Sequence, residues 1–125
     1  MSYNVSTGDC MKINIATIVE KDGTITKNKY VGLWNDGVIT YQESKCKVKI
    51  IVTNKVKMIR ENNEFKLELN FSKGKTLNPY LLKENNHILD IEIDSKKIEI
   101  NDNSIYIEYL INEELCIFRL EWEEC

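Results

Sequence analysis

Arg60 is the residue of this sequence whose charge and predicted position most suggest a functional site. It follows Val56 and Met58 at alternate positions of one predicted strand, so all three side chains should point to the same face. A guanidinium on the inner face of a sheet needs a partner. Two partners remain open: a carboxylate, carbonyl or tyrosine of the protein itself, or an acidic ligand that Arg60 would bind as a bidentate donor at a barrel mouth.

Groups for acid–base catalysis are few and scattered. His87 is the only histidine, and its place at the start of a strand predicts a partly exposed side chain. The carboxylates Asp90, Glu92 and Asp94 share one face of a strand, which alternation predicts to be the solvated face. We therefore expect a protein that is not an enzyme, and an enzyme built on His87 and nearby carboxylates stands as a third alternative.

The cysteines do not show the spacing of a metal site. Cys10, Cys46, Cys116 and Cys125 lie far apart, and no Cys-x-x-Cys pair is present. The sequence also lacks a glycine-rich phosphate loop and a calcium loop. It therefore predicts no metal and no cofactor.

Apolar and polar residues alternate with a period of two along most of the chain, which is typical of strands with one buried face. The dipeptides Asp22-Gly23 and Asp36-Gly37 are strong hairpin signals between such runs. Strands are predicted near residues 12–19, 24–34, 38–44, 47–53, 55–60, 64–71, 76–83, 87–94, 96–101, 104–111 and 115–122, some of which should merge or bend. The 76–83 segment suits only an edge or a bulge, because Pro79 cannot donate a hydrogen bond.

Many short strands joined by hairpins predict an all-β fold, a single antiparallel meander. Closure into a barrel of about 8–10 strands would remove the unpaired edges. We expect a flexible N-terminal extension at residues 1–11 and one β-barrel domain at residues 12–125.

Charge is distributed unevenly along the 125 residues, whose net charge is −3. Lysines dominate residues 27–60 and carboxylates dominate from residue 84 onward, so one wall should be basic and the opposite wall acidic. The overall acidity makes nucleic acid an unexpected partner. No segment has the length and apolarity of a membrane span, and the polar N-terminus does not look like a signal peptide, so we expect a cytoplasmic protein.

Short motifs from residue 12 onward carry a family resemblance. They are Lys12–Val19, Tyr30-Val31-Gly32, Met58-Ile59-Arg60, Phe71-Ser72-Lys73-Gly74-Lys75, Asn78-Pro79-Tyr80, Ser104–Tyr109 and Leu115–Trp122. Together they resemble the YwiB-like bacterial proteins, a domain of unknown function placed with the calycin barrels. Leu81 and Asn62 stand where that family tends to have glycine. The resemblance implies a calycin-like fold and a cytoplasmic setting, and it implies no activity.

The expected function is non-enzymatic binding of a small, partly apolar or acidic molecule inside the barrel. The side chains expected to line the pocket are Ile15, Met58, Arg60, Phe71, Tyr80 and Tyr109. The alternative is a protein-interaction or structural barrel with a filled interior, which binds through its outer wall or as a homodimer.

Overall fold

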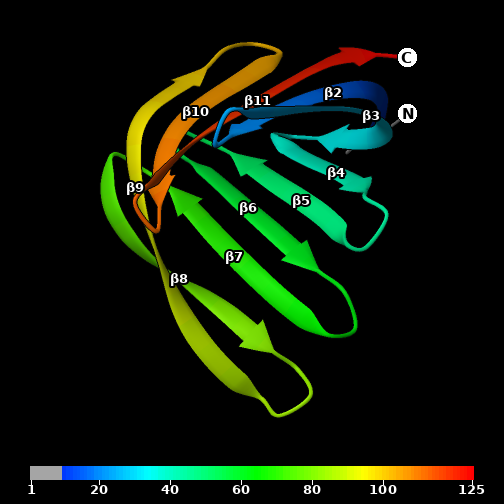
Figure 1. Cartoon of the computed structure of the whole chain (residues 1–125). Coiled ribbons are helices and arrows are strands. Elements are labelled where there is room, and N and C mark those ends of the chain that lie inside the picture. Colours follow the sequence, from blue (N-terminus) through cyan, green and yellow to red (C-terminus); the bar gives the residue numbers. More distant parts are fainter. Residues whose placement is uncertain (1–9) are drawn as a thin grey trace.

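The computed structural model describes residues 10–125, and the regular structure of this part is entirely β-strand (Figure 1). The strands are β2 (Met11–Lys21), β3 (Thr24–Asn35), β4 (Val38–Gln42), β5 (Lys47–Val52), β6 (Val56–Glu61), β7 (Phe65–Phe71), β8 (Gly74–Leu82), β9 (His87–Ile100), β10 (Ser104–Ile111) and β11 (Glu114–Glu124). The predicted all-β fold is confirmed. The predicted extension at residues 1–11 lies outside the described residues, apart from its last two positions.

Two predicted strands merge, and the segment predicted as an edge or a bulge pairs with β9 throughout β8 but with β7 only from Tyr80 to Leu82. The segments at 87–94 and 96–101 form the single strand β9, whose register against β10 shifts between Glu108 and Tyr109. Such a shift bends a long strand without ending it. Pro79 lies within β8, opposite Asp90 of β9.

The two strongest hairpin signals form tight turns. Asp22 and Gly23 have φ values of 52° and 75°, and Asp36 and Gly37 have values of 49° and 84°. Positive φ at both central positions matches the right-handed twist of the flanking strands. The turns therefore fix the register of β2 against β3 and of β3 against β4.

The ten strands form a closed barrel in the order β10-β11-β2-β3-β4-β5-β6-β7-β8-β9, with β9 returning to pair with β10. The last strand, β11, pairs with the first described strand, β2, over nine positions from Cys116 to Glu124. The backbone N–H of Cys125 extends this seam by donating to the carbonyl oxygen of Lys12 at 3.0 Å. Closure of the predicted barrel is thus confirmed.

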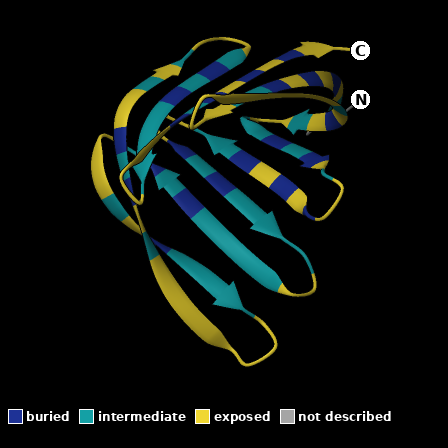
Figure 2. Cartoon of the chain, in the orientation of Figure 1, coloured by how far each residue is buried: buried dark blue, intermediate teal, exposed yellow. Residues whose placement is uncertain are grey.

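Alternating burial along the strands places one side-chain set inside the barrel (Figure 2). The buried core is formed by Ile13, Ile15, Ile39, Val48, Ile50, Val56, Met58, Leu69, Phe71, Ile93, Ile105, Ile107, Phe118, Leu120 and their neighbours. Most are aliphatic or β-branched, which suits a pleated surface buried on one face. Hydrophobic burial along this lining is the main stabilising contribution to the barrel.

Adjacent strands part in two places. β3 pairs with β4 only from Leu33 to Asn35, although β3 is twelve residues long. At the point of parting, a side chain at Gly32 would lie 2.4 Å from the backbone carbonyl oxygen of Thr40, so only glycine fits. β3 therefore crosses close to β4 and then leaves it.

The second parting lies between β7 and β8, which pair only from Phe65 to Leu67 on the β7 side. The fully buried amide of Asn78 bridges the rest of this gap. Its Oδ1 accepts from the backbone N–H of Asn70 at 2.6 Å, and its Nδ2 donates to the carbonyl oxygen of Ile91 at 3.0 Å. A side-chain amide thus supplies hydrogen bonds that a regular ladder would have made.

Candidate ligand site at one end of the barrel

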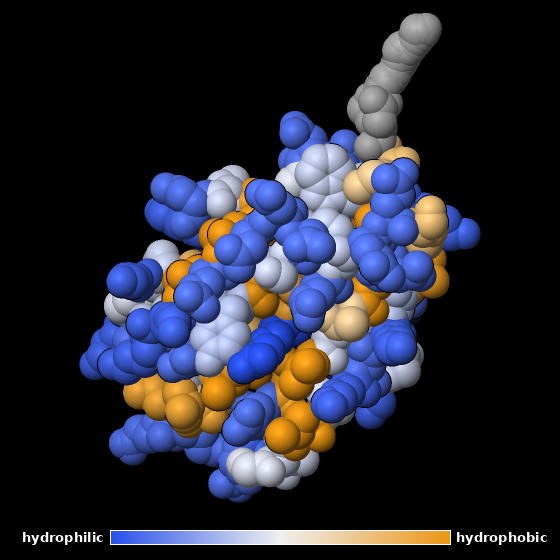
Figure 3. All heavy atoms as spheres, turned by 90° about the horizontal axis from the view of Figure 1, so that it is seen from above, coloured by the Kyte–Doolittle hydropathy of each residue, from blue (hydrophilic) through white to orange (hydrophobic). Residues whose placement is uncertain are grey.

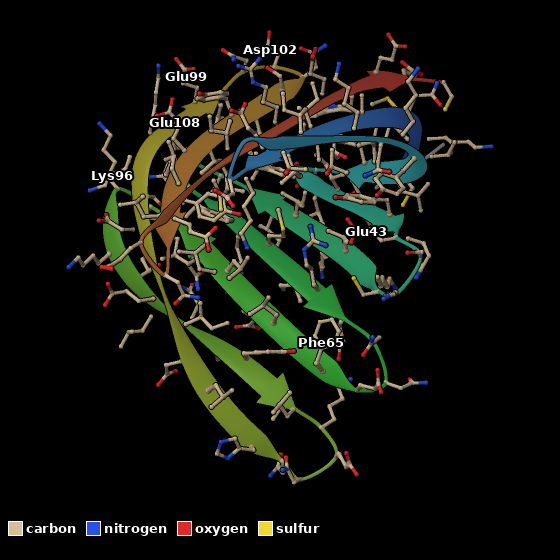
Figure 4. All side chains as sticks on the ribbon, in the orientation of Figure 1. Glu43, Phe65, Lys96, Glu99, Asp102 and Glu108 are labelled. Carbon is tan, nitrogen blue, oxygen red and sulfur yellow. The ribbon has the colours of Figure 1, made fainter. Side chains whose placement is uncertain are left out.

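Several connections between strands lie at one end of the barrel, which we call the mouth. They join β4 to β5 (43–46), β6 to β7 (62–64) and β8 to β9 (83–86), and Figure 1 shows them along one side of the molecule. The stick view labels Glu43 and Phe65 at this end (Figure 4). Inward side chains near these connections form the candidate site.

Arg60 points inward, as its alternation with Val56 and Met58 predicts, and lies on β6 opposite Val48 of β5. Its Nη1 donates to Oε1 of Glu43, which comes from the connection between β4 and β5. The side chains of Arg60 and Glu43 are 27% and 20% exposed, so the ion pair lies at the boundary between core and solvent. Of the two partners that the sequence left open, the structure shows a carboxylate of the protein.

The buried thiol of Cys46 also contacts this pair. Its Sγ donates to Oε1 of Glu43 at 3.5 Å. Burial and the neighbouring Glu43 carboxylate raise the pKa of the Cys46 thiol, which keeps it protonated and unreactive at neutral pH.

Two tyrosines stack beside the ion pair. The rings of Tyr30 and Tyr41 lie 4.7 Å apart and bridge the place where β3 leaves β4. Burial and the Glu43 carboxylate raise the pKa of Tyr41, while the Arg60 charge opposes them. The Tyr41 hydroxyl is buried and has no hydrogen-bond partner among the described residues.

Half-buried aromatic and apolar side chains complete the mouth. Phe65 and Leu67 of β7 and Tyr80 of β8 face inward beside Arg60, and the Phe65 and Tyr80 rings meet edge to face at 5.7 Å. Tyr109 of β10 contacts Phe71 edge to face at 5.0 Å between ring centres. A different side, seen from above the β10 and β11 strands of Figure 1, also has hydrophobic surface between hydrophilic side chains (Figure 3).

The six predicted lining residues divide into two groups. Ile15, Met58 and Phe71 are almost fully buried and belong to the packed core. The other three, Arg60, Tyr80 and Tyr109, are half-buried toward the mouth.

Sequence reasoning missed Glu43, Tyr30, Tyr41 and Cys46 as members of this cluster. A usable signal was present for Glu43, because Ile39, Tyr41 and Glu43 occupy alternate positions. Continuing that alternation beyond β4 would have placed a carboxylate on the inner face, opposite in charge to Arg60.

Groups suited to catalysis do not converge in the described part. His87 is exposed at the start of β9, and no hydrogen bond joins it to an acid or a thiol there. Asp90 and Glu92 are exposed, and Asp94 is partly exposed on the same outer face. Within residues 10–125, no three His, Cys, Asp or Glu side chains are grouped as metal ligands.

Three hollows in the described part of the chain do not include Arg60. The largest of these three, about 630 Å³, lies over β2, β3 and β11, and its lining includes the predicted residue Ile15 together with Tyr30, Lys29, Glu121 and Trp122. Two smaller ones, about 380 and 280 Å³, lie at the turns after β2 and β10 and beside the turns after β5 and β7.

Comparison with known proteins defines the fold. No family model matches the chain, and no curated protein matches it in sequence. Among solved structures, the crystal structure of the YwiB protein from Bacillus subtilis is similar, with a TM-score of 0.63. The likeness covers 93% of this chain and 92% of that chain at 15% sequence identity. The chain therefore has a YwiB-like fold.

Proposed function

We propose that this barrel is a non-enzymatic binding module that takes a small, partly apolar carboxylic acid at its mouth. Arg60 would receive the acid group. The observation that carries the proposal is the Tyr41 hydroxyl, which is buried without a hydrogen-bond partner beside the Arg60–Glu43 pair.

An unpaired buried hydroxyl costs about 1–3 kcal/mol, so a ligand oxygen that accepts from it would gain unusual affinity. Arg60 has five N–H donors, and the described contacts use Nη1 toward Glu43. Donors thus remain for a ligand carboxylate that joins or displaces Glu43.

The apolar part of the ligand would contact Phe65, Leu67 and Tyr80. These side chains are half-buried and face inward, beside the guanidinium. A ligand that covers them would remove apolar surface from water, which contributes roughly 25 cal/mol per Å². The chemistry of the lining therefore favours a molecule with one acidic and one apolar end.

An alternative role in protein interaction is favoured by a different observation. Ile15, Met58 and Phe71 fill the interior, whereas Leu77 and Ile88 of the β8–β9 hairpin are 66% and 59% exposed. In that case the barrel would serve as a scaffold, and its outer wall would bind a partner or a second copy.

We also propose that the protein is a calycin and that it lies in the cytoplasm. The closed antiparallel meander supports the first assignment by analogy of fold. Four free thiols, two of them buried, support a reducing compartment. As a separate finding, no helix within residues 10–125 is suited to crossing a membrane.

Binding of 8-anilinonaphthalene-1-sulfonate, an anion with an apolar body, tests the proposal by fluorescence titration. Arg60→Leu should weaken binding by about tenfold or more, since hydrogen bonds to charged groups contribute roughly 1.5–3 kcal/mol. Glu43→Gln should strengthen it, because the internal competitor for Arg60 loses its charge.

Arg119→Leu is the matched control, because Arg119 is the only other arginine and lies on the outer face over the ring of Tyr106. It should leave the affinity unchanged. Equal affinities for wild type, Arg60→Leu and Glu43→Gln would overturn the proposal. Native mass spectrometry of freshly purified protein then shows whether an acidic molecule copurifies.

A further inference from the structure

The strand β3 has a free edge over most of its length. Its pairing with β4 ends at Leu33, while its pairing with β2 continues to Thr24. Within residues 10–125, no strand pairs with the 24–32 segment on the side away from β2. At this place the barrel is closed by only three residue pairs between β3 and β4. The rest of β3 therefore has a free edge, even though each strand of the barrel has two neighbours.

The turn at Asp22-Gly23 determines which backbone groups face that edge. In a two-residue hairpin the flanking residues, here Lys21 and Thr24, exchange both backbone hydrogen bonds, and alternate pairs follow. The backbone N–H and C=O groups of odd-numbered β3 residues therefore point away from β2. Leu33 and Asn35 use theirs on β4, and four residues remain, Ile25, Lys27, Lys29 and Val31.

The side chains of the same four residues give this edge a chemical pattern. Ile25 and Val31 are 56% and 58% exposed, and the exposed Lys27 and Lys29 lie between them. On the neighbouring strand β2, Ile18 lies opposite Lys27 and Ala16 lies opposite Lys29, so neither lysine has a carboxylate opposite it on that strand. No salt bridge involves either lysine in the described part of the chain.

We propose that the β3 edge binds an extended acidic peptide as an added antiparallel strand. The peptide would have acidic residues opposite Lys27 and Lys29 and apolar residues opposite Ile25 and Val31. Its pattern, apolar-x-acid-x-acid-x-apolar, supplies backbone hydrogen bonds for affinity and cross-strand pairs for specificity.

Charge argues against a second copy of this chain as the occupant. A two-fold antiparallel pairing that uses all four edge residues would place Lys27 of each copy opposite Lys29 of the other. Like charges directly opposite one another are destabilising, and lysines on an edge commonly prevent self-association. The same lysines attract an acidic strand.

Fluorescence anisotropy with a labelled Val-Thr-Glu-Thr-Glu-Thr-Ile peptide tests the proposal. A matched peptide with lysine in place of both glutamates should bind at least about tenfold more weakly at low salt, because two cross-strand charge pairs change sign. The double variant Lys27→Glu and Lys29→Glu should reverse this preference. The control is the same double substitution at Lys47 and Lys49, which lie on the fully paired strand β5. It should leave the preference for the acidic peptide unchanged.

N-methylated peptides test the backbone contacts with wild-type protein, so the result does not depend on how a variant folds. Methylation of the two glutamate nitrogens, which point toward β3, should abolish binding. Methylation of two threonine nitrogens, which point away, should leave binding unchanged. Any of three results would overturn the proposal. The two methylations could have equal effects, the acidic and basic peptides could bind equally, or the protein could dimerise with rising concentration in place of binding the peptide.

Discussion

Tyr41 shows at the scale of one residue how stability and binding oppose each other in this barrel. Its ring is buried and stacks on Tyr30, which stabilises the place where β3 leaves β4. Its hydroxyl is buried without a partner, which destabilises the same place. A group that costs stability in the free protein is expected where a ligand supplies the missing hydrogen bond.

Tyr41→Phe keeps the ring and removes the hydroxyl. We expect the free energy of unfolding to rise by about 1 kcal/mol, because an unsatisfied buried group is lost. Binding of the anilinonaphthalene sulfonate should weaken in the same variant. Urea unfolding and fluorescence titration measure the two effects, and a stability loss above about 1 kcal/mol would contradict this account of Tyr41.

Alkaline pH should destabilise the protein, because groups that are buried in their neutral form would have to lose a proton and become charged. Burial, with Cys116 beside it, raises the pKa of Tyr109 from 10.0 to about 12. The folded state thus holds this proton more tightly than the unfolded state. The resulting stability is fully present below pH 10.0 and is lost as the pH rises toward about 12.

Tyr109→Phe should therefore make the free energy of unfolding less dependent on pH between 10 and 12. Urea unfolding at several pH values in this range, for wild type and variant, gives the comparison. Identical slopes would show that the Tyr109 hydroxyl is not held in its neutral form by the fold.

Among the strands, the side chain of Asn78 holds β7 and β8 together where their backbones do not pair. The sequence predicted an irregular 76–83 segment, because Pro79 cannot donate. It did not predict the bridge, since the partners of Asn78 are backbone groups of β7 and β9 whose position depends on the bend of the sheet. The pairing of strands can be predicted from alternation and turn residues. The position of a gap between two strands, and the side chain that bridges it, depend on the curvature of the sheet.

Asn78→Ala should lower the free energy of unfolding by about 3 kcal/mol, because the backbone groups at Asn70 and Ile91 lose their partners in a buried place. Asn101→Ala removes an exposed amide at a turn and serves as the control, with an expected change within about 0.5 kcal/mol. Urea unfolding compares the two. A loss below about 1 kcal/mol at Asn78 would mean that the bridge is dispensable.

Closure is the property of the whole molecule, and it depends on the last strand. β11 pairs with β10 and with β2, so the last strand is joined to the first described strand. The buried residues Phe118, Leu120 and Trp122 also complete the core from this strand. Removal of residues 114–125 would expose two edges and open the interior.

We therefore expect a chain truncated after residue 113 to lose its cooperative unfolding transition, as measured by circular dichroism during heating. A circular permutant supplies the control, with the natural ends linked and new ends placed at the turn of Asp36 and Gly37. It should retain the transition, because every strand pair can still form. A cooperative transition in the truncated chain would show that closure is not needed for folding.

Sequence patterns predicted the whole molecule better than they predicted its site. Alternation and turn residues were sufficient for the antiparallel meander and for the inward direction of Arg60, and closure was inferred from the need to remove unpaired edges. They could not separate lining residues from core residues, because Met58 and Arg60 share one face and differ only in distance from the mouth. Depth along a barrel depends on strand tilt, which a period of two does not encode.

The proposed ligand binds at the mouth through the guanidinium of Arg60. Arg60 and Arg119 are the only arginines, so a ¹H–¹⁵N spectrum resolves their two Nε–H groups as two signals. Titration with the anilinonaphthalene sulfonate should shift the Arg60 signal and leave the Arg119 signal in place. A titration that shifts neither signal, or that shifts only Arg119, would contradict the claim.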